Sequence, residues 1–303
     1  APQEFAPCGA DGCQAGENDL LARTVTGVMT VPCYLNRDGC PVGSVFSYRK
    51  LKKTANFQAD RFVFYPARRK DNTMQVPFRC IIPRTALAKP SRLVEFGHAP
   101  YGGQDDVLRP DVQQLAQEGN LTICAARQAG NAAEDLPTLK AALADVNTFP
   151  RVVDRLQQGA LNSLMLGRLM IHPQGLVGQG AFRAPGGGPA IDTFTVAYDT
   201  ISSGAFGGMV AALSPDSVRA SLGTGGMNQT FMLPRSVDDV SYESILRAAY
   251  PKPVERALLL SMLQGQWDRG ETGGYAQSLT QDPLPSTPLH TLLFQAAVGD
   301  HQV

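Results

Sequence analysis

The chain has 303 residues, and its 27 Lys and Arg balance 27 Asp and Glu, so its formal net charge is zero. Without a basic field to attract polyanions, we expect neither a nucleic acid nor an acidic membrane surface as a partner. No apolar run approaches the ~18 residues that cross a bilayer, so we expect no membrane span. The length suits one large α/β domain with an N-terminal extension, or two domains of ordinary size.

Four of the six cysteines lie in the first forty residues, and two lie in apolar, strand-like runs: Cys8, Cys13, Cys33 and Cys40, then Cys80 and Cys124. Their spacings fit a zinc knuckle poorly, so we rank disulfides first, free buried thiols second and a metal site last. The sequence leaves the three pairings of the first four open. Disulfides and a start at Ala1, typical of signal-peptide cleavage, favour a secreted or periplasmic protein.

The first ninety residues read as antiparallel strands. β-type runs cover residues 24–35, 62–65 and 76–82, and turn-like segments at 36–39 and 69–72 separate them. We therefore predict a cysteine-containing, β-rich N-terminal extension over residues 1–90.

After residue 90 the pattern changes to short apolar runs that alternate with helical periodicity. The expected strands cover 93–96, 121–125, 193–198, 218–222 and 292–298, and the expected helices cover 107–118, 136–170, 205–213 and 254–267. Such alternation is typical of a mostly parallel sheet with helices on both faces. We predict an α/β domain over residues 91–303.

The turn after the expected strand at 193–198 carries the most informative motif. Its sequence is Thr-Ile-Ser-Ser-Gly at 200–204, followed by a helix of small residues. A nucleophile elbow holds its serine on such a strand-to-helix turn, where the flanking residues must be small. Gly204 meets this requirement, whereas Thr200 stands where the G-x-S-x-G pattern has its first glycine. Ser202 is the predicted nucleophile, and the alternative is a Ser/Gly-rich turn without chemistry.

A long insertion separates the last two expected strands, by 292 − 222 = 70 residues. An insertion of this length favours a cap over a site, at approximately 224–287, and ordinary crossover helices are the alternative. Its apolar side chains could form an acyl-binding wall or pack against the core. The residues in question are Phe231, Met232, Leu233, Leu258, Leu259, Leu260, Met262, Leu263 and Trp267.

Residues 90–303 resemble the α/β-hydrolase superfamily, specifically bacterial secreted serine esterases and lipases. The resemblance depends on three segments: the loop Gly97–Gly103 after a strand, the Ser202 turn, and Gly299–Val303 after a strand. It implies that the catalytic groups follow in the order nucleophile, acid, histidine. Asp300 then corresponds to the acid, with a strand-ending turn as its alternative role, and Asp268 is a weaker rival.

The resemblance leaves the catalytic histidine unassigned. The sequence contains only His98, His172, His290 and His301, and none occupies the family's position after a further strand. We expect this histidine beyond residue 303, in a hydrolase that is incomplete at its C-terminus. A non-catalytic relative is the competing interpretation.

The resemblance also predicts an oxyanion hole made of two backbone N–H groups. The first is that of Ser203, the residue after the nucleophile. The second would come from the loop after residue 97, where Pro100 has no N–H to donate. Ala99 or Tyr101 is therefore predicted to donate instead.

These features predict a serine hydrolase that acts on small-molecule or lipid carboxylic esters through an acyl-enzyme, without cofactor or metal. A serine peptidase would use the same residues, and a non-catalytic binding protein would explain Thr200, Pro100 and the missing histidine together. A dinucleotide enzyme is disfavoured, because the glycine clusters at 186–188 and 223–226 lack the G-x-G-x-x-G pattern.

Overall fold

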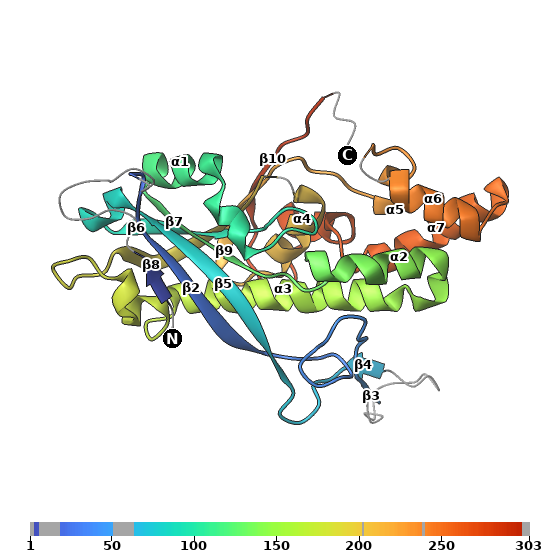
Figure 1. The fold of residues 1–303 in the computed structure, drawn as a ribbon, viewed down its shortest axis with the longest axis horizontal. Coiled ribbons are helices and arrows are strands. Elements are labelled where there is room, and N and C mark those ends of the chain that lie inside the picture. The colour runs from blue at the N-terminus through green and yellow to red at the C-terminus, as the bar shows by residue number, and fades with distance from the viewer. Residues whose placement is uncertain (1–2, 6–18, 51–63, 202, 238–239, 299–303) are drawn as a thin grey trace.

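A computed structural model describes residues 3–5, 19–50, 64–201, 203–237 and 240–298. These residues form an α/β fold around a mixed eight-stranded sheet of order β1-β2-β5-β7-β6-β8-β9-β10, with a separate hairpin of β3 and β4 (Figure 1). The predicted fold class, a mostly parallel sheet flanked by helices, is confirmed.

The N-terminal strands make the antiparallel half of the sheet, as predicted. β2 (Leu21–Pro32) pairs with β1 (Gln3–Phe5) on one side and with β5 (Thr73–Pro83) on the other. β5 then pairs antiparallel with β7 (Leu121–Ala126), so β1, β2 and β5 share one sheet with the later strands. The hairpin of β3 (Tyr48–Lys50) and β4 (Phe64–Pro66) lies apart.

The remaining strands run parallel from β7 outward. They are β6 (Ser91–Phe96), β8 (Ile191–Thr200), β9 (Ser217–Leu222) and β10 (Thr291–Phe294). The predicted strand at 292–298 was too long, because β10 ends at Phe294. Its partner β9 ends at Leu222, and without a partner the chain leaves the sheet, so that Val298 is fully exposed.

Helices cover both faces of the sheet. On one face, α1 (Pro110–Gly119) packs Val112 and Ala116 against residues of β5, β6 and β7. On the other, α3 (Pro150–Ile171) and α4 (Gly204–Leu213) contribute Leu166, Met170 and Met209 to the core. Short 3-10 turns connect the elements: η1 (Arg84–Leu87), η2 (Gln104–Leu108), η3 (Ala133–Asp135), η4 (Val146–Thr148), η5 (Leu176–Gly178) and η6 (Gly180–Phe182).

Polar side chains of α3 hold the loop between β2 and β3 in place. Asp154 accepts the Phe46 N–H at 2.9 Å, and Gln158 donates to the Pro32 carbonyl at 3.0 Å. Arg155 donates to the Cys40 carbonyl at 2.7 Å and to the Asp135 carboxylate at 2.6 Å. All three side chains are buried, so these bonds supply partners to backbone groups that water cannot reach.

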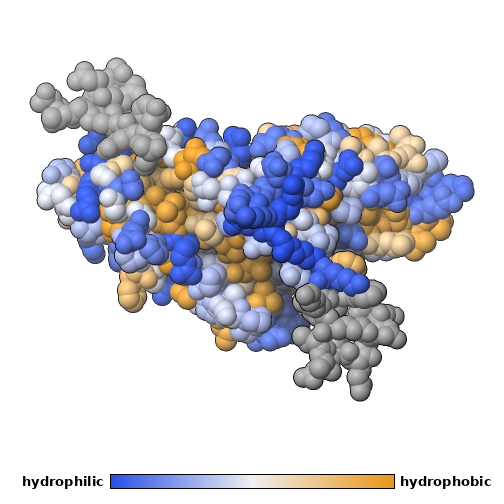
Figure 2. All heavy atoms as spheres, turned by 90° about the horizontal axis from the view of Figure 1, so that it is seen from below, coloured by the Kyte–Doolittle hydropathy of each residue, from blue (hydrophilic) through white to orange (hydrophobic). Residues whose placement is uncertain are grey.

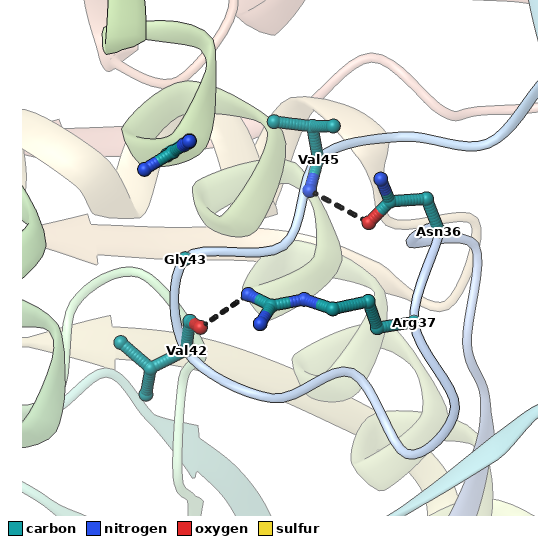
Figure 3. A pocket seen from close by; sticks show the side chains of 6 residues that line it. Asn36, Arg37, Val42, Gly43 and Val45 are labelled. Carbon is teal, nitrogen blue, oxygen red and sulfur yellow. Dashed lines mark hydrogen bonds between the residues drawn. The ribbon is translucent and has the colours of Figure 1, made fainter.

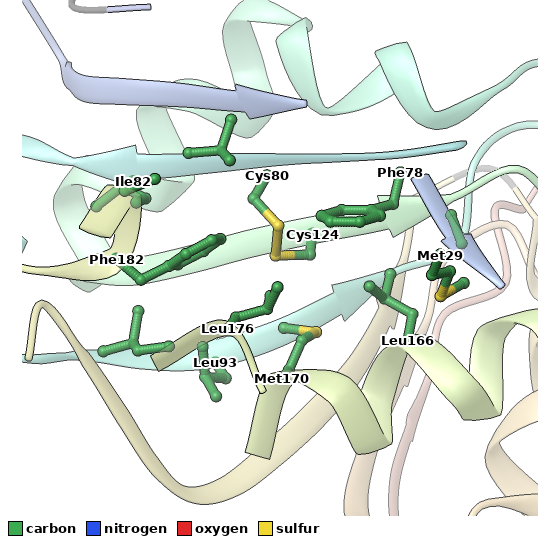
Figure 4. Packing of buried hydrophobic residues seen from close by; sticks show 14 of the residues in the cluster. Met29, Phe78, Cys80, Ile82, Leu93, Cys124, Leu166, Met170, Leu176 and Phe182 are labelled. Carbon is green, nitrogen blue, oxygen red and sulfur yellow. A yellow bond between two sulfur atoms is a disulfide. The ribbon is translucent and has the colours of Figure 1, made fainter. Parts of the chain in front are cut away.

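Two disulfides are present in the described part of the chain. Cys33–Cys40 closes a loop of the N-terminal region, which agrees with the expected pairing among the first four cysteines, while Cys8 and Cys13 lie outside the described residues. Cys80–Cys124 joins directly opposed residues of β5 and β7 inside the main core (Figure 4). The sequence did not indicate this second pairing.

The insertion after β9 is helical. It contains α5 (Gln229–Met232), α6 (Val240–Ala249), α7 (Pro253–Trp267), η7 (Thr272–Tyr275) and α8 (Ala276–Thr280). Leu233, Leu263 and Trp267 are buried against α2 (Leu136–Ala144) and α3, and Trp267 meets the Phe149 ring edge-on with centroids 5.0 Å apart.

Other apolar side chains of the insertion face solvent. Phe231, Leu258 and Met262 are 62%, 63% and 68% exposed. Figure 2 shows apolar surface on the lobe at its right-hand end, where Figure 1 places α6 and α7. The apolar residues singled out in the sequence thus divide between core packing and surface. Among the described residues, no helix is both long and apolar enough to cross a membrane.

Candidate active site

The carboxyl ends of β6, β8, β9 and β10 meet at one edge of the sheet, where open α/β sheets bind their ligands. A cavity of about 210 Å³ lies here between the ends of β8 and β9 and the segment after β10. Asp199, Thr200 and Ser221 contribute to its lining. The predicted nucleophile turn, which follows β8, therefore belongs to the edge where a ligand is expected.

Close backbone packing shapes this turn. A Cβ on Gly204 would lie 2.7 Å from the Gly223 carbonyl oxygen and 2.7 Å from the Gly225 Cα. The Gly204 N–H donates to the Gly223 carbonyl, and the Gly223 N–H donates to the Thr200 carbonyl at 2.7 Å. Only glycine at 204 permits this approach. The small-residue requirement inferred from the sequence is thus met by a direct contact between the start of α4 and the loop after β9.

The predicted nucleophile Ser202, the predicted acid Asp300 and His301 lie outside the described residues. Their assignment stays a prediction.

All three amides predicted to form the oxyanion hole donate to other groups. The Ser203 N–H bonds the Thr200 hydroxyl at 3.0 Å, and the Ala99 N–H bonds the Asp106 carboxylate at 2.8 Å. Tyr101, with a left-handed φ of 58°, donates its N–H to the Asn131 carbonyl at 2.9 Å. An oxyanion would have to displace one of these acceptors. The roles of the three residues stay predictions, and the Thr200 hydroxyl is a site feature that the sequence reasoning missed.

The described histidines do not face the predicted nucleophile turn with a free nitrogen. His98 is buried; its Nδ1–H donates to the Ala99 carbonyl, and its Nε2 accepts the Gln128 N–H at 3.0 Å. Burial lowers the pKa of His98 below its ordinary value. His172 follows α3, and His290 precedes β10 at the opposite, amino edge of the sheet. Neutral His98 therefore fixes the loop that follows β6.

The structure places one carboxylate, that of Asp199, at the cavity and another, that of Asp268, in the insertion. Asp199 lines the cavity; burial raises its pKa, and a hydrogen bond with Ser221 opposes that shift. Asp268, the rival for the catalytic acid, accepts a hydrogen bond from Gln264 of α7 at 2.7 Å. The neighbouring Arg269 pairs instead with Asp154 of α3, at 3.1 Å.

A set of buried, hydrogen-bonded polar side chains packs beside the loop after β6. The Gln128 side chain donates to the Ser163 hydroxyl at 3.0 Å and approaches the Tyr198 hydroxyl at 3.4 Å. Glu95 of β6 is fully buried, and this burial raises its pKa well above the ordinary value, while a hydrogen bond with Ser163 opposes that shift. Burial therefore favours the neutral, protonated form of Glu95 in the folded protein.

We expect Glu95→Gln to stabilise the protein at pH 8 more than at pH 4. The unfolded chain releases the Glu95 proton above pH ~4.5, whereas burial makes the folded protein release it only at higher pH, so stability falls as pH rises from there towards the folded pKa. Glutamine has no proton to release and removes this slope. Urea unfolding at a series of pH values checks the result, and equal slopes for the two proteins would contradict it.

Two further cavities hold none of the predicted site residues. One, of about 430 Å³, lies within the loop 36–45 and is lined by Arg37 and Arg151; Arg37 donates to the Val42 carbonyl there (Figure 3). The other, of about 380 Å³, lies between β2 and the end of α3. Within the described ranges, no cluster of three or more histidine, cysteine or acidic side chains could hold a metal ion.

No protein-family model matches the sequence, and no curated protein matches it. Solved structures similar to this chain include acetyl xylan esterase 1 from Thermoanaerobacterium sp. JW/SL YS485, with 13% identity, coverage of 85% of this chain and 84% of that one, and a TM-score of 0.41. The acetyl xylan esterase from Paenibacillus sp. R4 has 10% identity, coverage of 85% and 83%, and a TM-score of 0.43.

The acylaminoacyl peptidase from Pyrococcus horikoshii has 13% identity, coverage of 82% of this chain and 32% of that one, and a TM-score of 0.41. These three structures are at most 13% identical to this chain, and the resemblance of its motifs to the α/β-hydrolase superfamily stays a prediction.

Proposed function

We propose that the protein is a serine hydrolase that acts on carboxylic esters through an acyl-enzyme, with Ser202 as nucleophile. The observation that carries the proposal is the turn between β8 and α4. It lies at the ligand-binding edge of the sheet, and Gly204 allows the start of α4 to contact the loop after β9. Such a turn presents a serine at the top of the sheet.

In the proposed mechanism Ser202 attacks the ester carbonyl, a histidine takes its proton, and Asp300 orients that histidine. The ester C–O bond then breaks, and the histidine gives this proton to the departing alcohol, which leaves the acyl-enzyme. Both nitrogens of His98 are bonded, and His290 lies at the opposite edge of the sheet. The base is therefore proposed to come from outside the described residues. Water then releases the acid from the acyl-enzyme.

The proposed substrates are small-molecule or lipid esters, with the acyl group in the cavity of about 210 Å³ beside the turn. A serine peptidase would use the same groups, and rates on matched ester and amide substrates separate the two. We further propose a division into an N-terminal extension (1–90) and a hydrolase domain (91–303) with a cap at approximately 224–287. The two disulfides support a secreted or periplasmic location.

A non-catalytic binding protein on the same fold is the second candidate. The three engaged amides at Ser203, Ala99 and Tyr101 favour it, because a site ready for acyl transfer points its donors at the position of the oxyanion.

Labelling with a fluorophosphonate, followed by peptide mass spectrometry, tests the proposed function. We expect an adduct on Ser202 and none on the Ser202→Ala variant, because only an activated serine reacts with this probe. Ser203→Ala is the matched control, since it removes the neighbouring hydroxyl and keeps the amide. An unlabelled chain would favour the binding protein.

A further inference from the structure

A hydroxyl group of the helical insertion forms hydrogen bonds with the first turn of α4. Thr272, at the start of η7, is completely buried. Its Oγ1 accepts the Gly208 N–H at 2.9 Å and donates to the Gly204 carbonyl at 2.6 Å. These are the two groups that an α-helix joins to each other across one turn. A side chain 64 residues away thus takes part in the hydrogen bonding of the helix that follows Ser202.

The glycines of α4 are necessary for this contact. A Cβ on Gly208 would lie 2.4 Å from the Thr272 Cγ2 and 2.5 Å from its Oγ1. On the other side, Gly204 contacts the loop after β9. The first turn of α4 is therefore held between Thr272 and that loop.

Contacts with other elements matter for the first turn of α4, because the residues of this turn have low helix propensity. Three of its first five residues are glycine, the residue with the lowest helix propensity after proline. The small residues that allow the close approach of helix and sheet also leave the backbone free to adopt other conformations. Contacts of the first turn must supply the order that its own residues do not.

The residue beside Thr272 fixes η7 to the rest of the insertion. Glu271 is completely buried; it accepts the Gln229 N–H of α5 at 3.0 Å and a hydrogen bond from the Gln264 side chain of α7. Gln264 in turn accepts the Thr230 hydroxyl at 2.7 Å. The hydrogen bonds of Glu271 and of its neighbour Thr272 together therefore connect α5 and α7 to the first turn of α4.

We propose that Thr272 is a positioning residue for the nucleophile: its hydroxyl holds the first turn of α4, and hence Ser202 and the Ser203 amide, in register with the helical insertion. This inference rests on the proposed function of Ser202. It assigns the insertion a role in the geometry of the nucleophile in addition to its proposed role as a cap.

Thr272→Val tests the inference, because valine keeps the shape and removes the hydroxyl. We expect kcat for an ester substrate, and the rate of fluorophosphonate labelling, to fall by about 10- to 100-fold with KM nearly unchanged, as small displacements of a reacting group do. Thr272→Ser restores the hydroxyl and should retain kcat. Hydrogen exchange of the Gly208 amide should be faster in the valine variant than in the serine variant.

Thr122→Val is the matched control, because it also removes a buried threonine hydroxyl. This hydroxyl forms a 2.6 Å hydrogen bond with Ser91 and makes no contact with α4 through it. It should leave kcat unchanged. If Thr272→Val folds poorly, Thr272→Ala serves instead, with Thr272→Ser again as the comparison.

The outcomes separate the two proposals. An active wild-type protein in which Thr272→Val keeps its kcat would overturn the inference and leave the proposed function standing. Absence of labelling in the wild type would contradict the proposed function, and unchanged exchange at Gly208 would still overturn the positioning role.

Discussion

Replacing Thr200 by valine is expected to raise kcat on an ester substrate by about 10²-fold, since one oxyanion donor is worth about 10²–10³ in kcat. The Thr200 hydroxyl accepts the Ser203 N–H, the amide predicted to stabilise the oxyanion. Valine has nearly the shape of threonine and no acceptor, so it frees the amide without opening a cavity. Stopped assays over a range of ester concentrations measure the change.

The same substitution should lower stability by about 1–3 kcal/mol, the cost of leaving a buried donor unsatisfied. Thr200→Ser is the control, because it keeps the hydroxyl and should behave like the wild type in both measurements. If valine destabilises the protein and leaves kcat unchanged, Thr200 is only a structural partner of the turn and the Ser203 amide is not an oxyanion donor.

Removing the Cys80–Cys124 disulfide is expected to destabilise the protein by about 4 kcal/mol, because the chain-entropy model assigns that value to a closed loop of this length. The two cysteines are 44 residues apart and lie in the main core. Urea unfolding of the Cys80→Ala/Cys124→Ala double variant gives the change in the free energy of unfolding.

The Cys33–Cys40 disulfide provides the comparison, because its separation of 7 residues predicts only about 2.4 kcal/mol in the same model. If both double variants lose the same free energy of unfolding, the disulfides do not stabilise the protein by restricting the unfolded chain.

The order of strands and helices could be predicted from the sequence because it depends on local patterns. The apolar runs at 93–96, 121–125 and 218–222 became strands, and the small-residue run at 205–213 became a helix almost to the residue. β10 was predicted too long, since its end depends on where its neighbour β9 stops. Periodicity along one strand contains no information about the length of its partner.

Several features that the sequence did not reveal depend on partners that local patterns do not identify. Thr272 reaches α4 from the insertion, Asp106 takes the Ala99 amide, and Cys80 meets Cys124 across two strands. Thr200 is different, because its departure from the glycine pattern was visible. Its hydrogen bond to the Ser203 amide was not, since that depends on the rotamer of a side chain in a tight turn.

The loop between β2 and β3 has a consequence for synthesis of the chain. Its backbone groups at residues 32, 40 and 46 bond side chains of α3 that lie 126, 115 and 108 residues further on. While the chain emerges from the ribosome, the loop cannot take its final conformation before the first turns of α3 have been made. Contacts this far apart in sequence form late and slow folding. The Cys33–Cys40 disulfide, between residues only 7 apart in sequence, needs no part of α3 and can restrict this segment before its contacts with α3 form.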